Sequence, residues 1–205
     1  MCGRYAFFRW SQALAQLPGF PADQSPGWNI APGSQVMMIR AASGQREVAL
    51  ARWGLTPAWL TDLSRAPAQA RAETLAEQPM FREALQQRRC LLPANGFYEW
   101  RGNVRKRPYW LVGDSSPLYF AGIWENYPVA ELNWLSVAVV TQAAGGHRRP
   151  LILDEAEQAV WLDPLSTPAQ LTELLAGAQK PLRERPLATL VNDPALNAPE
   201  CLTPA

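Results

Sequence analysis

The stretch CLLPANGFYEW (residues 90–100) decides the fold class predicted for this chain. It holds two short apolar runs, 90–93 and 96–100, separated by Ala94 and Asn95. Short apolar runs bounded by turn residues are typical of strands, so we predict two strands that pair around Ala94-Asn95. Glu99 lies inside the second run between two aromatic residues, where partial burial is expected to raise its pKa.

Further strands and a few helices are predicted on both sides of this stretch. The predicted strands cover residues 1–9, 36–39, 48–53, 109–112, 118–124 and 134–141, with a turn near Ser43-Gly44 between the second and third. The predicted helices cover residues 11–17 with Ser11 as cap, 74–85, 154–161, and 167–176 with Thr167 as cap. Many strands with few helices between them indicate an α+β fold rather than a parallel doubly wound sheet.

Length and composition limit the class of protein. A chain of 205 residues fits one large domain or at most two small ones, and 48% hydrophobic residues suffice for a packed core. No apolar run reaches the roughly 18 residues of a membrane span, and the start does not resemble a secretory signal. We therefore expect a cytoplasmic protein. Cys2, Cys90 and Cys201 are too few and too widely spaced for a disulfide framework or a zinc site, so no metal is expected.

The charges are unevenly distributed, although the net charge is only +1. Residues 1–110 carry 14 Lys and Arg against 7 Asp and Glu, and residues 111–205 carry 5 against 11. Almost all the cations are Arg, whose planar guanidinium suits bidentate phosphate contacts, so the first half of the chain favours an anionic partner. An ordinary charged surface is an equally good interpretation. The nine Trp residues fit either base stacking or core packing.

Cys2 is the sharpest chemical feature of the sequence. Removal of Met1 would leave a free α-amine and a thiol on adjacent carbons, which titrate near ~8 and ~8.5 and are both usable nucleophiles. Such a pair captures an aldehyde as a Schiff base and then closes a thiazolidine ring. Arg4, two residues along a strand, would point to the same face as Cys2. The alternative is that Cys2 is a small buried residue at the start of a strand.

Six motifs occur in order along the chain: MCGRYA at the N-terminus, WNIAPGSQV (28–36), RWGLTPAW (52–59), ARAET (70–74), CLLPANGFYEW (90–100) and FAGIWE (120–125), continued by the His147 segment before Pro150. Together they resemble the SOS response-associated peptidase (SRAP) family. The resemblance covers residues 1–190. It implies one α+β domain with a curved, barrel-like, mainly antiparallel sheet and short flanking helices, followed by an irregular tail over 191–205. It also implies shielding of abasic sites in single-stranded DNA, with Cys2 forming a thiazolidine crosslink to the ring-opened sugar.

The resemblance assigns roles to individual residues. Cys2 is the nucleophile, Glu99 the catalytic glutamate that would move protons during Schiff-base formation, and His147 the group that assists sugar ring opening and crosslink reversal. Gln69 corresponds to a residue that orients the sugar. The residues expected to contact DNA are Arg4, Asn29, Trp53, Leu55, Pro57, Arg71, Arg148 and Arg149.

Two departures from the family pattern concern the site. Gln69 stands where the family usually has Asn, and its extra methylene must shift the hydrogen-bond geometry. The segment His147-Arg148-Arg149-Pro150 is one residue shorter than the usual His-x-Arg-Met-Pro, and the loop before it is compact. These changes leave the placement of His147 less determined than that of Cys2 or Glu99.

Two other functions stay open at this point. A thiol peptidase would use Cys2 as nucleophile and His147 as base, with the Met1–Cys2 bond as its nearest substrate. A non-enzymatic module would bind nucleic acid without forming a crosslink. The leading hypothesis is the abasic-site crosslinking protein, acting as a monomer on single-stranded DNA without a metal or organic cofactor.

Overall fold

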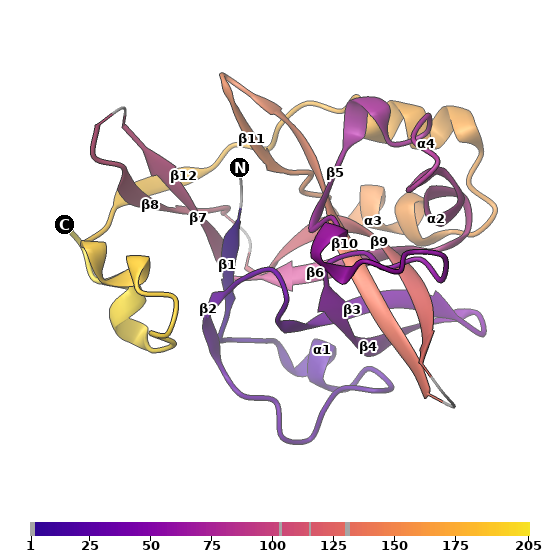
Figure 1. The fold of residues 1–205 in the computed structure, drawn as a ribbon, viewed down its shortest axis with the longest axis horizontal. Coiled ribbons are helices and arrows are strands. Elements are labelled where there is room, and N and C mark those ends of the chain that lie inside the picture. Colours follow the sequence, from indigo (N-terminus) through magenta and orange to yellow (C-terminus); the bar gives the residue numbers. More distant parts are fainter. Residues whose placement is uncertain (1–2, 103, 115, 130–131) are drawn as a thin grey trace.

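The computed structural model describes residues 3–102, 104–114, 116–129 and 132–205. It has two antiparallel-rich sheets, one closed into a barrel and one open, with the longer helices packed on the barrel side (Figure 1). This confirms the predicted α+β class. Within the described residues, no helix is long and apolar enough to cross a membrane.

The barrel is formed by five strands that close on themselves. Their order is β10, β4, β3, β6, β9 and back to β10, and only the β10–β4 pairing is parallel. Two shorter strands, β11 and β5, extend β10 beyond the ring. The strands are β3 (Gln35–Ala42), β4 (Gln45–Trp53), β5 (Gln69–Arg71), β6 (Arg89–Ala94), β9 (Leu118–Val129), β10 (Leu132–Ala144) and β11 (His147–Pro150).

The open sheet has five strands in the order β12-β8-β7-β1-β2. It contains the start of the chain and also a strand from near its end. The strands are β1 (Arg4–Phe7), β2 (Gly27–Ile30), β7 (Gly96–Arg101), β8 (Arg107–Val112) and β12 (Arg183–Pro186).

The predicted pairing of the two halves of CLLPANGFYEW is wrong. β6 pairs with β3 and β9 in the barrel, whereas β7 pairs with β1 and β8 in the open sheet. The chain crosses between the sheets at Asn95, whose side chain accepts hydrogen bonds from the Phe8 and Arg9 amides at 2.7 and 2.9 Å and donates to the Arg9 carbonyl at 2.8 Å. Asn95 therefore ties the end of β1 to the crossing instead of forming a hairpin turn.

Three short helices, α2, α3 and α4, lie together beside the barrel, and α1 lies apart from them near β3 and β4 (Figure 1). Ser11 and Thr167 cap α1 and α4 as predicted, and Asp154 forms a capping box at α3. The helix predicted over 74–85 forms only from Arg82 onward, as α2, since the segment contains Pro79, which disfavours helical backbone before it. The helices are α1 (Gln12–Ala15), α2 (Arg82–Gln87), α3 (Glu155–Leu162) and α4 (Pro168–Leu175), with 3-10 turns at Leu63–Arg65, Ala72–Thr74, Thr189–Asn192 and Pro199–Leu202.

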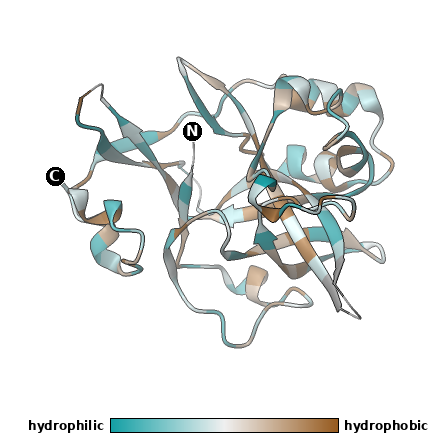
Figure 2. Cartoon of the chain, in the orientation of Figure 1, coloured by the Kyte–Doolittle hydropathy of each residue, from teal (hydrophilic) through white to brown (hydrophobic). Residues whose placement is uncertain are grey.

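The C-terminal segment, residues 187–205, packs on one face of the open sheet. Leu187, Val191 and Cys201 are buried there against Tyr98 and Trp110, in a second apolar cluster apart from the barrel core. The predicted irregular tail thus contains two short 3-10 helices with buried side chains. Hydrophilic residues gather instead on β11, on β12 and at the end of β7 (Figure 2).

Candidate functional site

The open sheet brings the start of the chain next to Glu99. In the antiparallel pairing of β1 with β7, Arg4 lies opposite Tyr98. Continuing this register by one residue sets Gly3 opposite Glu99. A Cβ added at Gly3 would meet no heavy atom of the described structure within 4 Å apart from its chain neighbours, so the chain borders open space here. Cys2, the predicted nucleophile, lies outside the described residues.

The Glu99 carboxylate is buried and held by two arginines. Its side chain is 4% exposed, and it accepts hydrogen bonds from Arg149 Nε at 2.9 Å and from Arg101 Nη2 at 2.8 Å. Burial alone would raise the pKa of Glu99, but the hydrogen bonds and charges of Arg149 and Arg101 outweigh it and hold the pKa below its ordinary value. The predicted rise in the Glu99 pKa is therefore wrong.

A second carboxylate completes this group. Glu184 on β12 accepts two hydrogen bonds of 2.7 Å from Arg101, and its Oε2 lies 3.7 Å from Nη2 of Arg149. The Arg101 guanidinium also lies over the ring of Tyr109, 4.8 Å from its centroid. Glu99, Arg101, Arg149 and Glu184, here called the Glu99 cluster, connect β7, β11 and β12 through alternating charges.

His147 lies on the side of β11 that faces the Glu99 cluster. It follows the two-residue turn Gly145-Gly146, where both residues have positive φ angles that only glycine adopts easily. Because side chains alternate along a strand, His147 shares a face with Arg149, the partner of Glu99. His147 itself is exposed.

Arg148 and Arg71 lie in a neighbouring group on β11 and β5. Arg148 donates to Glu73 at 2.7 Å and to the Thr141 carbonyl at 2.6 Å, and its hydrogen bond lowers the pKa of Glu73. Arg71, opposite Thr141 in the register, is exposed and has no ion-pair partner within the described part of the chain. Half-buried Gln69 lies two residues earlier on the same strand.

Arg4 and Asn29 face away from Glu99. The Arg4 guanidinium lies 5.2 Å from the centroid of the Trp100 ring and donates to Asn29 Oδ1 at 3.1 Å and to the Val191 carbonyl at 2.6 Å. Side chains alternate along β7, so Trp100 and Glu99 lie on opposite faces. The structure therefore does not bring Arg4 together with the Glu99 cluster, and the Asn29 amide binds the C-terminal segment at the carbonyls of Asp193 and Leu196.

The predicted base-contacting residues of the segment 53–57 lie in the interior. Trp53 is 1% exposed and donates from Nε1 to the Ala68 carbonyl at 2.7 Å, while Leu55 and Pro57 are also buried. The exposed aromatic side chain of this region is Trp59, at 62% exposure, which sequence reasoning missed. Its position two residues after Pro57, outside every predicted strand and helix, was the available signal.

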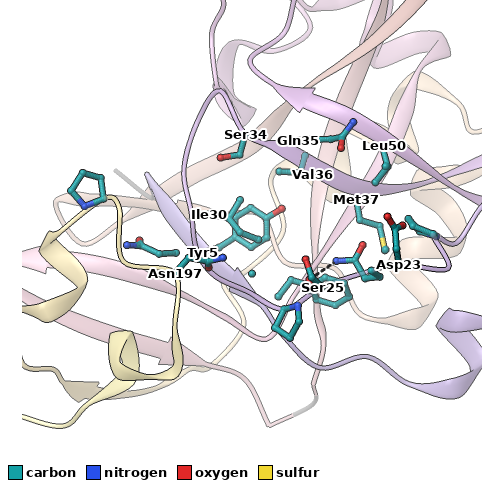
Figure 3. Close-up of a pocket in the computed structure, with 17 residues that line it drawn as sticks. Tyr5, Asp23, Ser25, Ile30, Ser34, Gln35, Val36, Met37, Leu50 and Asn197 are labelled. Carbon is teal, nitrogen blue, oxygen red and sulfur yellow. Dashed lines mark hydrogen bonds between the residues drawn. The ribbon is translucent and has the colours of Figure 1, made fainter.

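A cavity of about 510 Å³ lies on another part of the surface (Figure 3). Tyr5 and Phe7 line it, together with Asn29 and residues of the loop before β2, and Asp23 is its only charged lining residue. Glu99, Gln69 and His147 do not line this cavity. It is therefore separate from the Glu99 cluster.

The two described cysteines are enclosed. Cys90 lies in the barrel core, where burial raises the pKa of its thiol, and Cys201 belongs to the C-terminal segment and is buried between it and the open sheet. Neither can act as an accessible nucleophile. No group of three or more His, Cys, Asp or Glu side chains with metal-ligand geometry occurs among the residues that the structure describes.

Comparisons with known proteins identify the family of the chain. The model of the family "SOS response associated peptidase (SRAP)" matches residues 1–194. The abasic site processing protein YoqW of Bacillus subtilis is 32% identical, with 98% of this chain and 99% of YoqW covered, and the rat protein HMCES, of the same description, is 28% identical over 95% of this chain and 70% of its own length.

Solved structures share the fold. A protein from Bacteroides thetaiotaomicron superposes with a TM-score of 0.86 at 22% identity, with both chains fully covered. A phage-related protein from Bordetella bronchiseptica superposes with a TM-score of 0.70 at 26% identity, over 91% of this chain and 94% of its own. The family model spans nearly the whole chain and includes both sheets, and so this chain belongs to the SOS response associated peptidase (SRAP) family.

Proposed function

We propose that this chain processes abasic sites in single-stranded DNA by capturing the ring-opened sugar covalently through Cys2, once Met1 has been removed. The observation that supports the proposal is the β1–β7 register, which sets Gly3, the neighbour of Cys2 in the chain, opposite the buried Glu99. The relatives described as abasic site processing proteins support the same substrate.

The chemistry is a condensation that releases one water. The α-amine of Cys2 attacks the sugar aldehyde, the resulting carbinolamine loses hydroxide as water to give a Schiff base, and the thiol adds to the C=N carbon to close the thiazolidine. The thiol proton ends on the ring nitrogen. An ionised Glu99 can accept the proton that the attacking amine must lose and return it to the departing hydroxyl group.

The lowered pKa of Glu99 specifies the order of these proton transfers. A carboxylate that is ionised at neutral pH cannot donate first, so Glu99 acts as an acceptor and becomes an acid only after it has taken the amine proton. Exposed His147, on the same face of β11 as Arg149, is suited to proton transfer at the sugar.

Two exposed side chains suit the DNA itself. Arg71 offers an exposed guanidinium to a phosphate, and Trp59 offers an indole face to an unstacked base.

The test is a denaturing gel of the protein, with loss of Met1 verified by mass, after incubation with single-stranded DNA that carries one abasic site. A shifted band that Cys2→Ala lacks is the expected result. Absence of the band from the mature wild-type protein would contradict the proposal and leave noncovalent DNA binding or peptidase activity to be tested.

A further inference from the structure

Besides contacting Glu99, Arg101 and Arg149 both lie near one oxygen of a second carboxylate, that of Glu184. Oε2 of Glu184 lies 2.7 Å from Nη2 of Arg101 and 3.7 Å from Nη2 of Arg149. The second oxygen, Oε1, lies 2.7 Å from Nη1 of Arg101. Glu184 therefore occupies a position where one guanidinium donates two hydrogen bonds to an anion and a second guanidinium lies within ion-pair distance of it.

The exposure of the two carboxylate side chains shows which anion can leave. The Glu184 side chain is 42% exposed, whereas the Glu99 side chain on the inner side of the same arginines is 4% exposed. Glu184 is carried by β12, which is an edge strand of the open sheet. An exposed carboxylate on an edge strand can rotate into water at little cost, because exposed ion pairs contribute little to stability.

A DNA phosphate has the chemistry needed to replace this carboxylate. Arg binds carboxylate and phosphate in the same bidentate geometry, and a phosphodiester carries the same single negative charge. Glu99 already neutralises one of the two guanidinium charges, so the pair offers a second anion one net positive charge.

We propose that Arg101 and Arg149 form a phosphate-binding subsite, which Glu184 fills in the free protein and a backbone phosphate of single-stranded DNA fills in the complex. The proposal rests on the DNA-binding function proposed above and adds Arg101 and Glu184 to it. Glu184 then weakens binding to any strand, so that only DNA with further contacts at the Cys2 site displaces it effectively.

The experiment measures binding without crosslinking. The probe is fluorescent single-stranded DNA with a tetrahydrofuran abasic analogue, which has no aldehyde, titrated with protein at several salt concentrations. Glu184→Gln is expected to bind about three- to tenfold more tightly than wild type, since the competing charge is gone. Arg101→Gln is expected to bind more weakly and to reduce the slope of log K against log salt by about 0.7, the value for one phosphate contact on a single strand.

A matched control separates displacement from a general change in charge. Asp114→Asn removes one negative charge from an exposed ion pair with Arg183, the neighbour of Glu184 on β12, and is expected to change the affinity by less than about twofold. Adding Arg101→Gln to Glu184→Gln should abolish the gain in affinity. Glu184→Asp, which keeps the charge but withdraws it by one methylene, provides a second variant and should bind with intermediate affinity.

Three results would overturn the inference: unchanged or weaker binding by Glu184→Gln, an equal gain in Asp114→Asn, or an unchanged salt slope in Arg101→Gln. If wild type still forms the Cys2-dependent crosslink in that case, only this inference fails. If wild type neither binds the probe nor crosslinks natural abasic DNA, the proposed function fails with it.

Discussion

Glu99 on β7 and Arg149 on β11 are joined by a 2.9 Å hydrogen bond that links the open sheet to the barrel. The two residues are 50 positions apart in the chain and belong to different sheets. Their contact places a buried, ionised carboxylate beside the start of β1. The candidate site therefore lies at the junction of the two sheets. The residues of the Glu99 cluster come from both sheets, on β7, β11 and β12.

Glu99→Gln is expected to slow crosslink formation by about 100-fold or more, because an amide cannot accept the amine proton. The amide keeps the shape of the side chain and one acceptor for the two arginines. The rate of appearance of the shifted band measures the effect. Glu173→Gln, an exposed glutamate on α4, is the control and should crosslink at the wild-type rate. Equal rates for both variants would remove Glu99 from the mechanism.

Acid should destabilise the fold through the Glu99 cluster. The pKa of Glu99 is lowered in the folded state, so this buried carboxylate stabilises the fold above the unfolded value of about 4.3, and the stabilisation is lost as the pH falls through the folded value. Urea unfolding at neutral pH and below about pH 4 should therefore show a smaller loss of stability on acidification in Glu99→Gln than in wild type. A loss of equal size in both proteins would contradict the linkage.

Asn95→Ala should destabilise the protein by about 2–4 kcal/mol, because two part-buried amides on the segment after β1 lose the acceptor that the buried Asn95 side chain provides. Asn197→Ala is the comparison, since Asn197 accepts one exposed hydrogen bond from the Trp28 amide and its loss should cost about 1 kcal/mol. Urea denaturation measures both. If Asn95→Ala lowers the free energy of unfolding by no more than Asn197→Ala does, Asn95 does not stabilise the crossing of the chain between the two sheets.

Trp59 and Trp53 should respond differently to truncation. Trp59→Ala is expected to weaken binding to single-stranded DNA by about 1–3 kcal/mol and to leave the melting temperature nearly unchanged, as its side chain is exposed. Trp53→Ala should cost about 3–5 kcal/mol of folding stability, because it empties a core position. If Trp53→Ala stays fully folded and loses DNA affinity while Trp59→Ala keeps it, this assignment is reversed.

The local structure was largely predictable from the sequence. The caps at Ser11 and Thr167 and the turn at Ser43-Gly44 all occur as predicted, because each depends on the conformational preference of one or two residues. The helix predicted over 74–85 began too early, because the apolar spacing was given more weight than Pro79.

The long-range contacts were not predictable in the same way. CLLPANGFYEW contains two strands as predicted, but a hydrophobic pattern does not show which strands pair, so the crossing at Asn95 was missed. The direction of the Glu99 pKa depends on Arg101, two residues along the same strand, and on Arg149, 50 residues away, and the contact with Arg149 is not visible in the local sequence. Trp53 and Trp59 look alike in sequence, and only the fold shows which one is exposed.

The intact mass of the adduct tests covalent capture through Cys2 most directly. Mature protein lacking Met1 is mixed with a short single-stranded DNA that carries one natural abasic site, and the product is weighed without reduction. We predict the summed mass of protein and DNA less one water, with the modification on Cys2, and no stable adduct from Cys2→Ser, which has the amine but no thiol. A stable adduct of the same mass from Cys2→Ser, or attachment at another residue, would contradict thiazolidine formation at Cys2.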